Sequence, residues 1–264
     1  MTRSSCAGLY ALCTHAVRGA AYRRLDHRYR AARRGGTLAS ARQQPAQRTR
    51  RAEVGAITAL FERAEVLRRK QADRPAVVAA LLKAQVAHFA CHGATDWDDP
   101  QQSGLILAND ERLTVEALLR LQLTEARLAV LSACETGLIG RQLPDEVIGL
   151  PTAFLNVGFA GVLASLWSVA DWSTAQLMAQ FYLLWRGHGM APSLALCAAQ
   201  RWFRDTDDHE KADAARRHLA TVERQARPEP VVVPLRDARR RAKGLSRPDP
   251  QHPFWWAAFY LTGV

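Results

Sequence analysis

Two short segments combine strand-like apolar residues with side chains that can do chemistry. One is His88-Phe-Ala-Cys-His-Gly93, and the other is Leu131-Ser-Ala-Cys-Glu-Thr-Gly137. A thiol and an imidazole held together are the minimum for a cysteine nucleophile with a proton-transfer partner, and Cys134 and His92 supply these groups. Backbone N–H groups at Gly93 and Cys134 can stabilise a developing oxyanion. If the two segments meet, the chemistry they predict is nucleophilic attack on a carbonyl.

The elements around these segments should bring them to one place. Residues 85–90 alternate and predict a strand, and residues 127–132 are a nearly continuous apolar run, typical of a strand buried on both faces. In an open parallel sheet, functional groups gather at the carboxyl ends of the strands. We therefore expect His92 and Cys134 to emerge on the same edge of a sheet.

Strands and helices alternate at short intervals, which predicts an α/β fold with a mostly parallel sheet covered on both faces. A polar loop is expected at 91–103 and a charged surface insertion at about 205–250, and the apolar residues 252–263 should return to the core. Helices are expected at 53–63, 76–83, 115–121, 147–156, 172–186 and 192–204, and strands at 64–67, 85–90, 104–108, 127–132 and 161–167.

The charge is concentrated at one end of the sequence. The formal net charge is +11, and residues 1–51 hold twelve arginines and a single acid, Asp26, so the rest of the chain is neutral overall. We expect residues 1–51 to be an arginine-rich leader, disordered or partly helical. Its alternatives are a segment that binds an acidic surface or nucleic acid, and a misassigned start.

The number of cysteines and the hydropathy of the chain indicate the cellular compartment and whether the chain spans a membrane. Five cysteines, an odd number without paired spacing, do not indicate a disulfide framework, and this favours a cytoplasmic protein. Residues 147–170 carry no charge and are long enough to span a bilayer. Pro151, Asn156 and Gly158 interrupt them, which favours a buried helix followed by a buried strand over a membrane span.

Metal and nucleotide sites have little support. His88, Cys91 and His92 with Asp96 could suggest zinc, but His88 and His92 have helical spacing on a predicted strand. Neither a P-loop nor a GxGxxG pattern is present. We expect no metal and no organic cofactor.

Seven short motifs, in order, resemble the CHAT domain, a caspase-like module in the clan of separase, metacaspases and gingipains. The resemblance runs from about residue 52 to 264, and the 42 positions from His92 to Cys134 fit the caspase spacing. It implies a caspase-like three-layer α/β/α sandwich. The matching motifs are Ser103–Leu107, Ile148–Leu150, Ala153–Leu155, Ala164–Val169 and Pro253–Phe259, together with the two segments named first.

The resemblance also implies a role for each matching residue. His92 corresponds to the catalytic histidine and Cys134 to the nucleophile. Gly93 and Cys134 correspond to the oxyanion-hole positions. His88 corresponds to a structural histidine that should point to the opposite side of its strand. The family usually has further core sequence upstream of residue 52, so the chain would lack its first strand or the leader would replace it.

A second set of residues is implied in substrate binding. Ser165, Trp167 and Ser168 lie on the segment along which caspase-like enzymes bind substrate in an extended conformation. Asp171 matches the second of two acids usual after this strand. Asp171, Asp145 and Glu146 would line an acidic pocket that favours Lys or Arg before the scissile bond.

Taken together, the resemblance implies a cysteine endopeptidase with a protein substrate and a role in bacterial conflict or cell-death systems. The alternative is a catalytically silent caspase-like scaffold or protein-interaction module. The sequence shows no internal repeat, so a helical-repeat regulator would act from another chain.

Overall fold

The computed structural model describes most of the chain from Glu53 onward and one strand before it. The described residues are 7–12, 53–96, 98–132, 149–167, 170–207, 210–211, 213 and 251–263.

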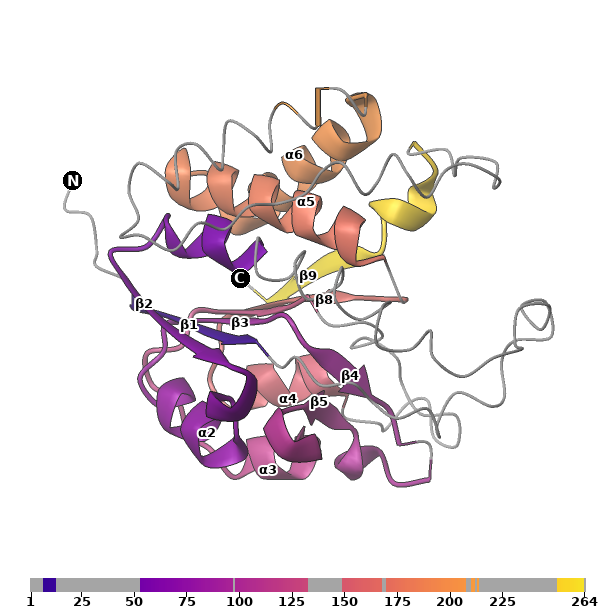
Figure 1. Cartoon of the computed structure of the whole chain (residues 1–264). Helices are drawn as coiled ribbons and strands as arrows, with labels where there is room; N and C mark the ends of the chain where they lie inside the picture. Colours follow the sequence, from indigo (N-terminus) through magenta and orange to yellow (C-terminus); the bar gives the residue numbers. More distant parts are fainter. Residues whose placement is uncertain are drawn as a thin grey trace, which may run out of the picture.

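The centre of the molecule is a six-stranded sheet with the order β2-β1-β3-β7-β8-β9 (Figure 1). Every neighbouring pair is parallel except β8 and β9, which are antiparallel. The predicted mostly parallel sheet is therefore confirmed. The strands are β1 (Ala7–Leu12), β2 (Arg63–Arg68), β3 (Val86–Phe89), β7 (Leu128–Leu131), β8 (Gly161–Ser165) and β9 (Phe259–Gly263).

Helices cover both faces of this sheet, which makes a three-layer α/β/α sandwich (Figure 1). On one face lie α2 (Arg74–Leu81), α3 (Val115–Leu119) and α4 (Leu150–Asn156). On the other lie the helical residues 53–58, α5 (Asp171–Tyr182) and α6 (Pro192–Asp205).

Each face has its own hydrophobic core, because successive strand residues point to opposite sides. In β3, Ala87 and Phe89 belong to the core under α2 and α4, whereas Val86 belongs to the core under α5 and α6. All four residues of β3 and of β7 are buried, as predicted for strands covered on both faces.

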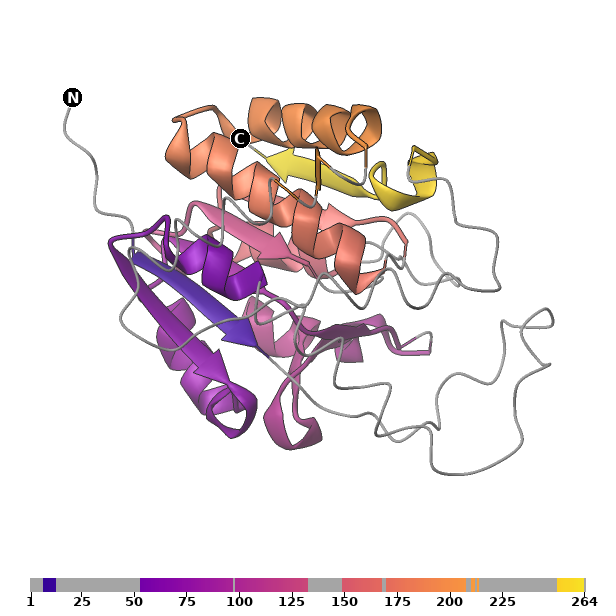
Figure 2. The ribbon, with the colours of Figure 1, turned by 45° about the horizontal axis from the view of Figure 1, so that its top comes forward.

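Strand β1 is the main difference from the sequence-based expectation. It lies within the arginine-rich leader and pairs in parallel with β2 on one side and β3 on the other (Figure 2). Its six residues, Ala-Gly-Leu-Tyr-Ala-Leu, carry no charge, which suits a strand inside a parallel sheet. This apolar run of six residues was too short to be recognised as a strand in a leader with twelve arginines. The domain boundary at residue 52 stays a prediction.

A second, antiparallel sheet occupies the stretch that was expected to be mainly a polar loop. It consists of β4 (His92–Ala94), β5 (Gly104–Ile106) and β6 (Arg112–Thr114), with a 3-10 turn at Pro100–Gln102. β5 lies within the strand expected at 104–108, whereas β4 and β6 were not predicted, because strands of three residues carry little periodicity. A Cβ on Gly104 would lie 2.5 Å from the Leu113 carbonyl oxygen, so β5 and β6 approach this closely only with glycine there.

The uncharged stretch 147–170 holds a helix and a strand, as predicted. Pro151 lies in the first turn of α4, where its missing N–H costs nothing, and Gly158 follows the helix with φ +119°. Within the described parts of the chain, no helix meets the length and apolarity needed to cross a membrane.

The C-terminal segment supplies β9, which pairs with β8 at one end of the sheet. A π-helical turn, Leu183–Gly187, follows α5, and a 3-10 turn at Pro253–Trp255 precedes β9. Ala258 and Phe259 are buried, so the predicted return of this segment to the core is confirmed. Most of the expected insertion at 205–250 lies outside the described residues.

Candidate active site

The strands that precede the two candidate catalytic residues are neighbours. β3 and β7 pair in parallel, and their last pair joins Phe89 to Leu131. His92 lies three residues after Phe89, and Cys134 lies three residues after Leu131. The two segments therefore leave the sheet at the same edge. Cys134 itself lies outside the described residues, so its approach to His92 stays a prediction.

His92 is fixed by the small antiparallel sheet. It opens β4 opposite Ile106, and Gly93 lies opposite Leu105. His92 and Gly93 are both half-buried, whereas Leu105 is fully buried in the core. The pairing with β5 thus anchors the candidate proton donor and one candidate oxyanion-hole residue to the body of the domain.

The expected substrate-binding segment follows β8. Ser165 ends β8, is buried, and lies opposite Phe259 of β9. The Leu166 N–H donates to the Ala258 carbonyl at 2.9 Å, which extends the contact with the C-terminal segment.

The residues after Ser165 lie beside aromatic side chains. The Trp167 indole N–H donates to the Phe254 carbonyl at 3.0 Å, and the two rings stack with centroids 6.3 Å apart. Asp171 is half-buried and is the first residue of α5, where a negative charge is favoured by the helix dipole. Three further predicted substrate-binding residues lie outside the described residues: Asp145, Glu146 and Ser168.

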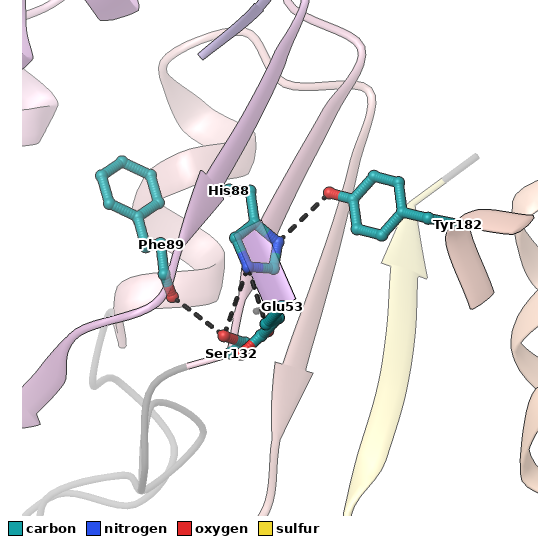
Figure 3. Close-up of polar contacts among 5 residues, drawn as sticks. All are labelled: Glu53, His88, Phe89, Ser132 and Tyr182. Carbon is teal, nitrogen blue, oxygen red and sulfur yellow. Dashed lines mark hydrogen bonds and ion pairs between the residues drawn. The ribbon is translucent and has the colours of Figure 1, made fainter. Parts of the chain in front are cut away.

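Beneath this edge lies a buried polar network that the sequence did not predict (Figure 3). His88 is fully buried, and its side chain lies on the α5 face of β3. Its Nε2 is 3.1 Å from Glu53 Oε1 and 3.4 Å from Ser132 Oγ, and its Nδ1 is 3.3 Å from the Tyr182 hydroxyl. Ser132 Oγ also contacts the Phe89 carbonyl oxygen at 3.4 Å.

One set of proton positions satisfies all these contacts. The Glu53 carboxylate accepts, so the proton of His88 lies on Nε2, which donates to Glu53 and in part to Ser132. The Ser132 hydroxyl then donates to the Phe89 carbonyl. The Tyr182 hydroxyl donates to Nδ1 of His88. Every member of this buried network thereby has a partner, as buried polar groups require.

Burial keeps the Tyr182 hydroxyl in its proton-carrying form. Desolvation raises the pKa of Tyr182 well above its ordinary value, the charge of Glu53 raises it further, and Arg186 opposes the shift. The phenol is therefore a donor throughout the neutral pH range.

The network also bears on the zinc alternative. Both ring nitrogens of His88 face protein groups, Tyr182 on one side and Glu53 on the other. Within the part of the chain that the structure describes, no group of three or more His, Cys, Asp and Glu side chains is arranged to hold a metal ion.

Comparisons with known proteins place the chain in a family. No curated protein matches it. Among solved structures, it is similar to the Arg-specific cysteine proteinase gingipain R, with 8% identity, a TM-score of 0.43, and coverage of 69% of this chain and 37% of that one. It is also similar to the complex of Porphyromonas gingivalis RgpB pro- and mature domains, with 11% identity, a TM-score of 0.43, and coverage of 78% and 45%. The chain thus spans less than half the length of either.

The family assignment rests on a match over nearly the whole chain. The CHAT domain family model matches residues 16–264. The chain therefore belongs to the CHAT domain family.

Proposed function

We propose that the chain is a cysteine endopeptidase in which Cys134 is the nucleophile and His92 its proton-transfer partner. The observation that carries the proposal is the parallel pairing of β3 with β7, which sends the segments bearing His92 and Cys134 out of the same sheet edge. Membership of the CHAT family supports it.

The chemistry needs only groups of the chain and water. The Cys134 thiolate attacks the scissile carbonyl, and the N–H groups of Gly93 and Cys134 donate to the oxyanion of the tetrahedral intermediate. His92, as imidazolium, gives its proton to the departing amine. Water then attacks the acyl-enzyme, His92 takes the proton of that water, and the carboxylic acid and the thiolate are released.

The end of β8 supports an extended substrate on one side only. The pairing of β7 with β8 runs to Val130 and Leu163, whereas β8 continues to Ser165. On its other side β8 is paired with β9 up to Ser165, and Leu166 continues this contact. A substrate strand would therefore add along residues 165–168 on the side facing the end of β7, which is where Cys134 follows in the sequence.

We also propose a preference for Lys or Arg before the scissile bond. Asp171 stands at the start of α5, five residues after the exposed Leu166, and Asp145 and Glu146 are the further candidates. If a basic side chain binds there, replacing Asp171 with Asn should raise KM for Lys and Arg peptides and leave KM for neutral peptides unchanged.

The test compares cleavage by three single variants on a library of quenched fluorogenic peptides that covers all residues before the scissile bond. Cys134→Ala and His92→Ala should each abolish cleavage. The matched control is Cys197→Ala, because Cys197 is an exposed thiol on α6 and its loss should change nothing. Cleavage retained by Cys134→Ala would refute the assignment. A wild-type chain that is inactive both alone and with a bound helical-repeat partner would favour the scaffold alternative.

Control by a partner protein is part of the proposal. A helical-repeat protein acting from another chain is the partner that the family resemblance suggests. The prediction is that the peptide-cleavage rate of the isolated chain changes when such a partner is bound.

A further inference from the structure

We propose that Ser132, held by His88, positions the proposed catalytic pair. It ties the end of β7, two residues before Cys134, to the end of β3, three residues before His92. This inference rests on the proposed function. It assigns a role to the buried network of Glu53, His88, Ser132 and Tyr182, which catalysis as described above does not use.

The first argument is the place of Ser132. The last backbone pair between the strands is Phe89 with Leu131, and Ser132 is the first residue after β7. Its hydroxyl reaches back to the Phe89 carbonyl and to His88 Nε2, both at 3.4 Å. A side chain thus continues the link between the two strands at the point where the backbone pairing ends.

The second argument is the rigidity of His88. Its ring has no exposed surface and is held by two helices of the same layer, by Glu53 of the 53–58 helix and by Tyr182 at the end of α5. The Tyr182 ring also meets the His88 ring edge-on, with centroids 5.6 Å apart. A histidine fixed in this way offers Ser132 a contact of constant position.

The third argument is the short chain between Ser132 and Cys134. Two Cα–Cα steps of about 3.8 Å keep the Cys134 Cα within roughly 8 Å of the Ser132 Cα. A change in the position of Ser132 therefore passes directly to the segment that carries the nucleophile. Reaction rates are sensitive to such shifts, and a displacement of about 1 Å can cost on the order of 100-fold.

The fourth argument is that stability alone does not explain a polar network here. Well-packed apolar residues of similar volume are often as stabilising as a buried ionic pair, or more so. The neighbouring residues on this face, Val86 and Ala90 of the β3 segment and Val130 of β7, are all apolar and buried. Of the polar members, His88 and Ser132 lie near the ends of β3 and β7, below the candidate site.

The experiment measures alkylation of Cys134 by iodoacetamide as a function of pH, residue by residue, by mass spectrometry. The exposed Cys197 is the internal reference in the same sample. In the wild type, a nearby imidazolium should keep Cys134 reactive well below the pH at which an ordinary thiol, with a pKa of about 8.5, loses reactivity. Ser132→Ala should move this profile toward that of Cys197 and slow alkylation at pH 6.5 about tenfold.

Two further variants separate positioning from stability. Tyr182→Phe removes the hydroxyl on the far side of the same imidazole and leaves both Ser132 contacts in place. It should lower the free energy of unfolding and shift the pH profile of Cys134 much less than Ser132→Ala does, because the ring at position 182 still packs edge-on against His88 and Glu53 still accepts from Nε2. Ser132→Thr keeps the hydroxyl and should restore the wild-type profile.

The outcomes distinguish this inference from the proposed function. If wild-type Cys134 reacts no faster than Cys197 at any pH, the proposed dyad fails, and the positioning role fails with it. If wild-type Cys134 is reactive at low pH and Ser132→Ala keeps its profile, only the positioning role is refuted. Equal shifts in Ser132→Ala and Tyr182→Phe would mean that the profile follows stability, which also refutes it.

Discussion

Removing the carboxylate of Glu53 should be among the most destabilising single changes in the domain. Its side chain is 2% exposed, it accepts from His88 Nε2 at 3.1 Å, and the His88 side chain has no exposed surface. In Glu53→Ala the Nε2 N–H loses this charged acceptor and keeps its longer, weaker contact with Ser132 Oγ at 3.4 Å. Leaving a buried donor without its acceptor costs about 1–3 kcal/mol, and more where the partner was charged, a large share of a typical total stability of about 5–15 kcal/mol.

Two further substitutions measure how much the charge of Glu53 contributes to the free energy of unfolding and how much is lost at an exposed carboxylate. Glu53→Gln keeps the volume and an acceptor oxygen and loses only the charge, so we expect a loss of about 1–2 kcal/mol. Glu65→Ala is the control, because Glu65 is an exposed carboxylate on the edge strand β2, and such surface changes stay within about 0.5 kcal/mol.

The assay is urea unfolding followed by tryptophan fluorescence at pH 7, with the free energy of unfolding extrapolated to zero denaturant for each variant. A loss below about 1 kcal/mol for Glu53→Ala, or an equal loss for Glu65→Ala, would refute the reasoning, because the buried contact would then contribute no more than an exposed carboxylate.

Three further predictions concern the surroundings of the site. Gly158→Ala should cost at least about 2 kcal/mol, because φ is +119° and the new Cβ would lie 2.0 Å from the Leu123 carbonyl oxygen; an unchanged urea midpoint would contradict this. Thr114→Ala should cost about 1 kcal/mol in the same assay by removing the N-cap of α3, and Thr114→Ser should restore it. Tyr182 ionises more readily in the unfolded chain, so the free energy of unfolding should fall as pH rises above about 10, by up to about 1.4 kcal/mol per pH unit, and Tyr182→Phe should lack this share of the decline. Identical pH dependence in the two proteins would show that the phenol does not contribute.

Elements with a strong local signal were predictable from the sequence. Residues 85–90 alternate and residues 127–132 are a nearly continuous apolar run, and both form buried strands of the parallel sheet. The helix expected at 115–121 forms as α3, and the Thr114 hydroxyl caps it by accepting from the Ala117 N–H. In such cases the residues that determine the helix or strand lie within it or directly beside it in the sequence.

Elements that depend on distant pairing were not predictable. Strand β1 lies between β2 and β3, and its partners begin at Arg63 and Val86. Residues 1–17 hold a single arginine, Arg3, but the other eleven arginines of the leader follow from Arg18 onward and favour a solvated segment, and the six-residue run of β1 carries too weak a signal on its own. The edge strand β2, in contrast, was expected at 64–67, where charged and apolar residues are mixed.

The site divides in the same way. His92 and Gly93 were identified from a short motif, and the structure shows what holds them, the pairing of β4 with β5. The partners of His88 carry no local signal. Glu53 lies 35 positions before it and Tyr182 lies 94 positions after it. These three side chains come together only when the helix layer formed by residues 53–58, α5 and α6 packs on the sheet.

The alternation of β3 nevertheless contains a constraint that points toward such a network. Val86, His88 and Ala90 have the spacing of one strand face, and both apolar residues of that face are buried under α5 and α6. A histidine at the middle position must then be buried as well, and a buried imidazole requires partners for both ring nitrogens. The alternation is therefore consistent with polar groups supplied by the helices that cover this face, the 53–58 helix and α5. It does not predict which groups, because several acidic and hydroxyl side chains precede and follow His88, and the choice among them is made by the packing angle of the 53–58 helix and α5 against the sheet.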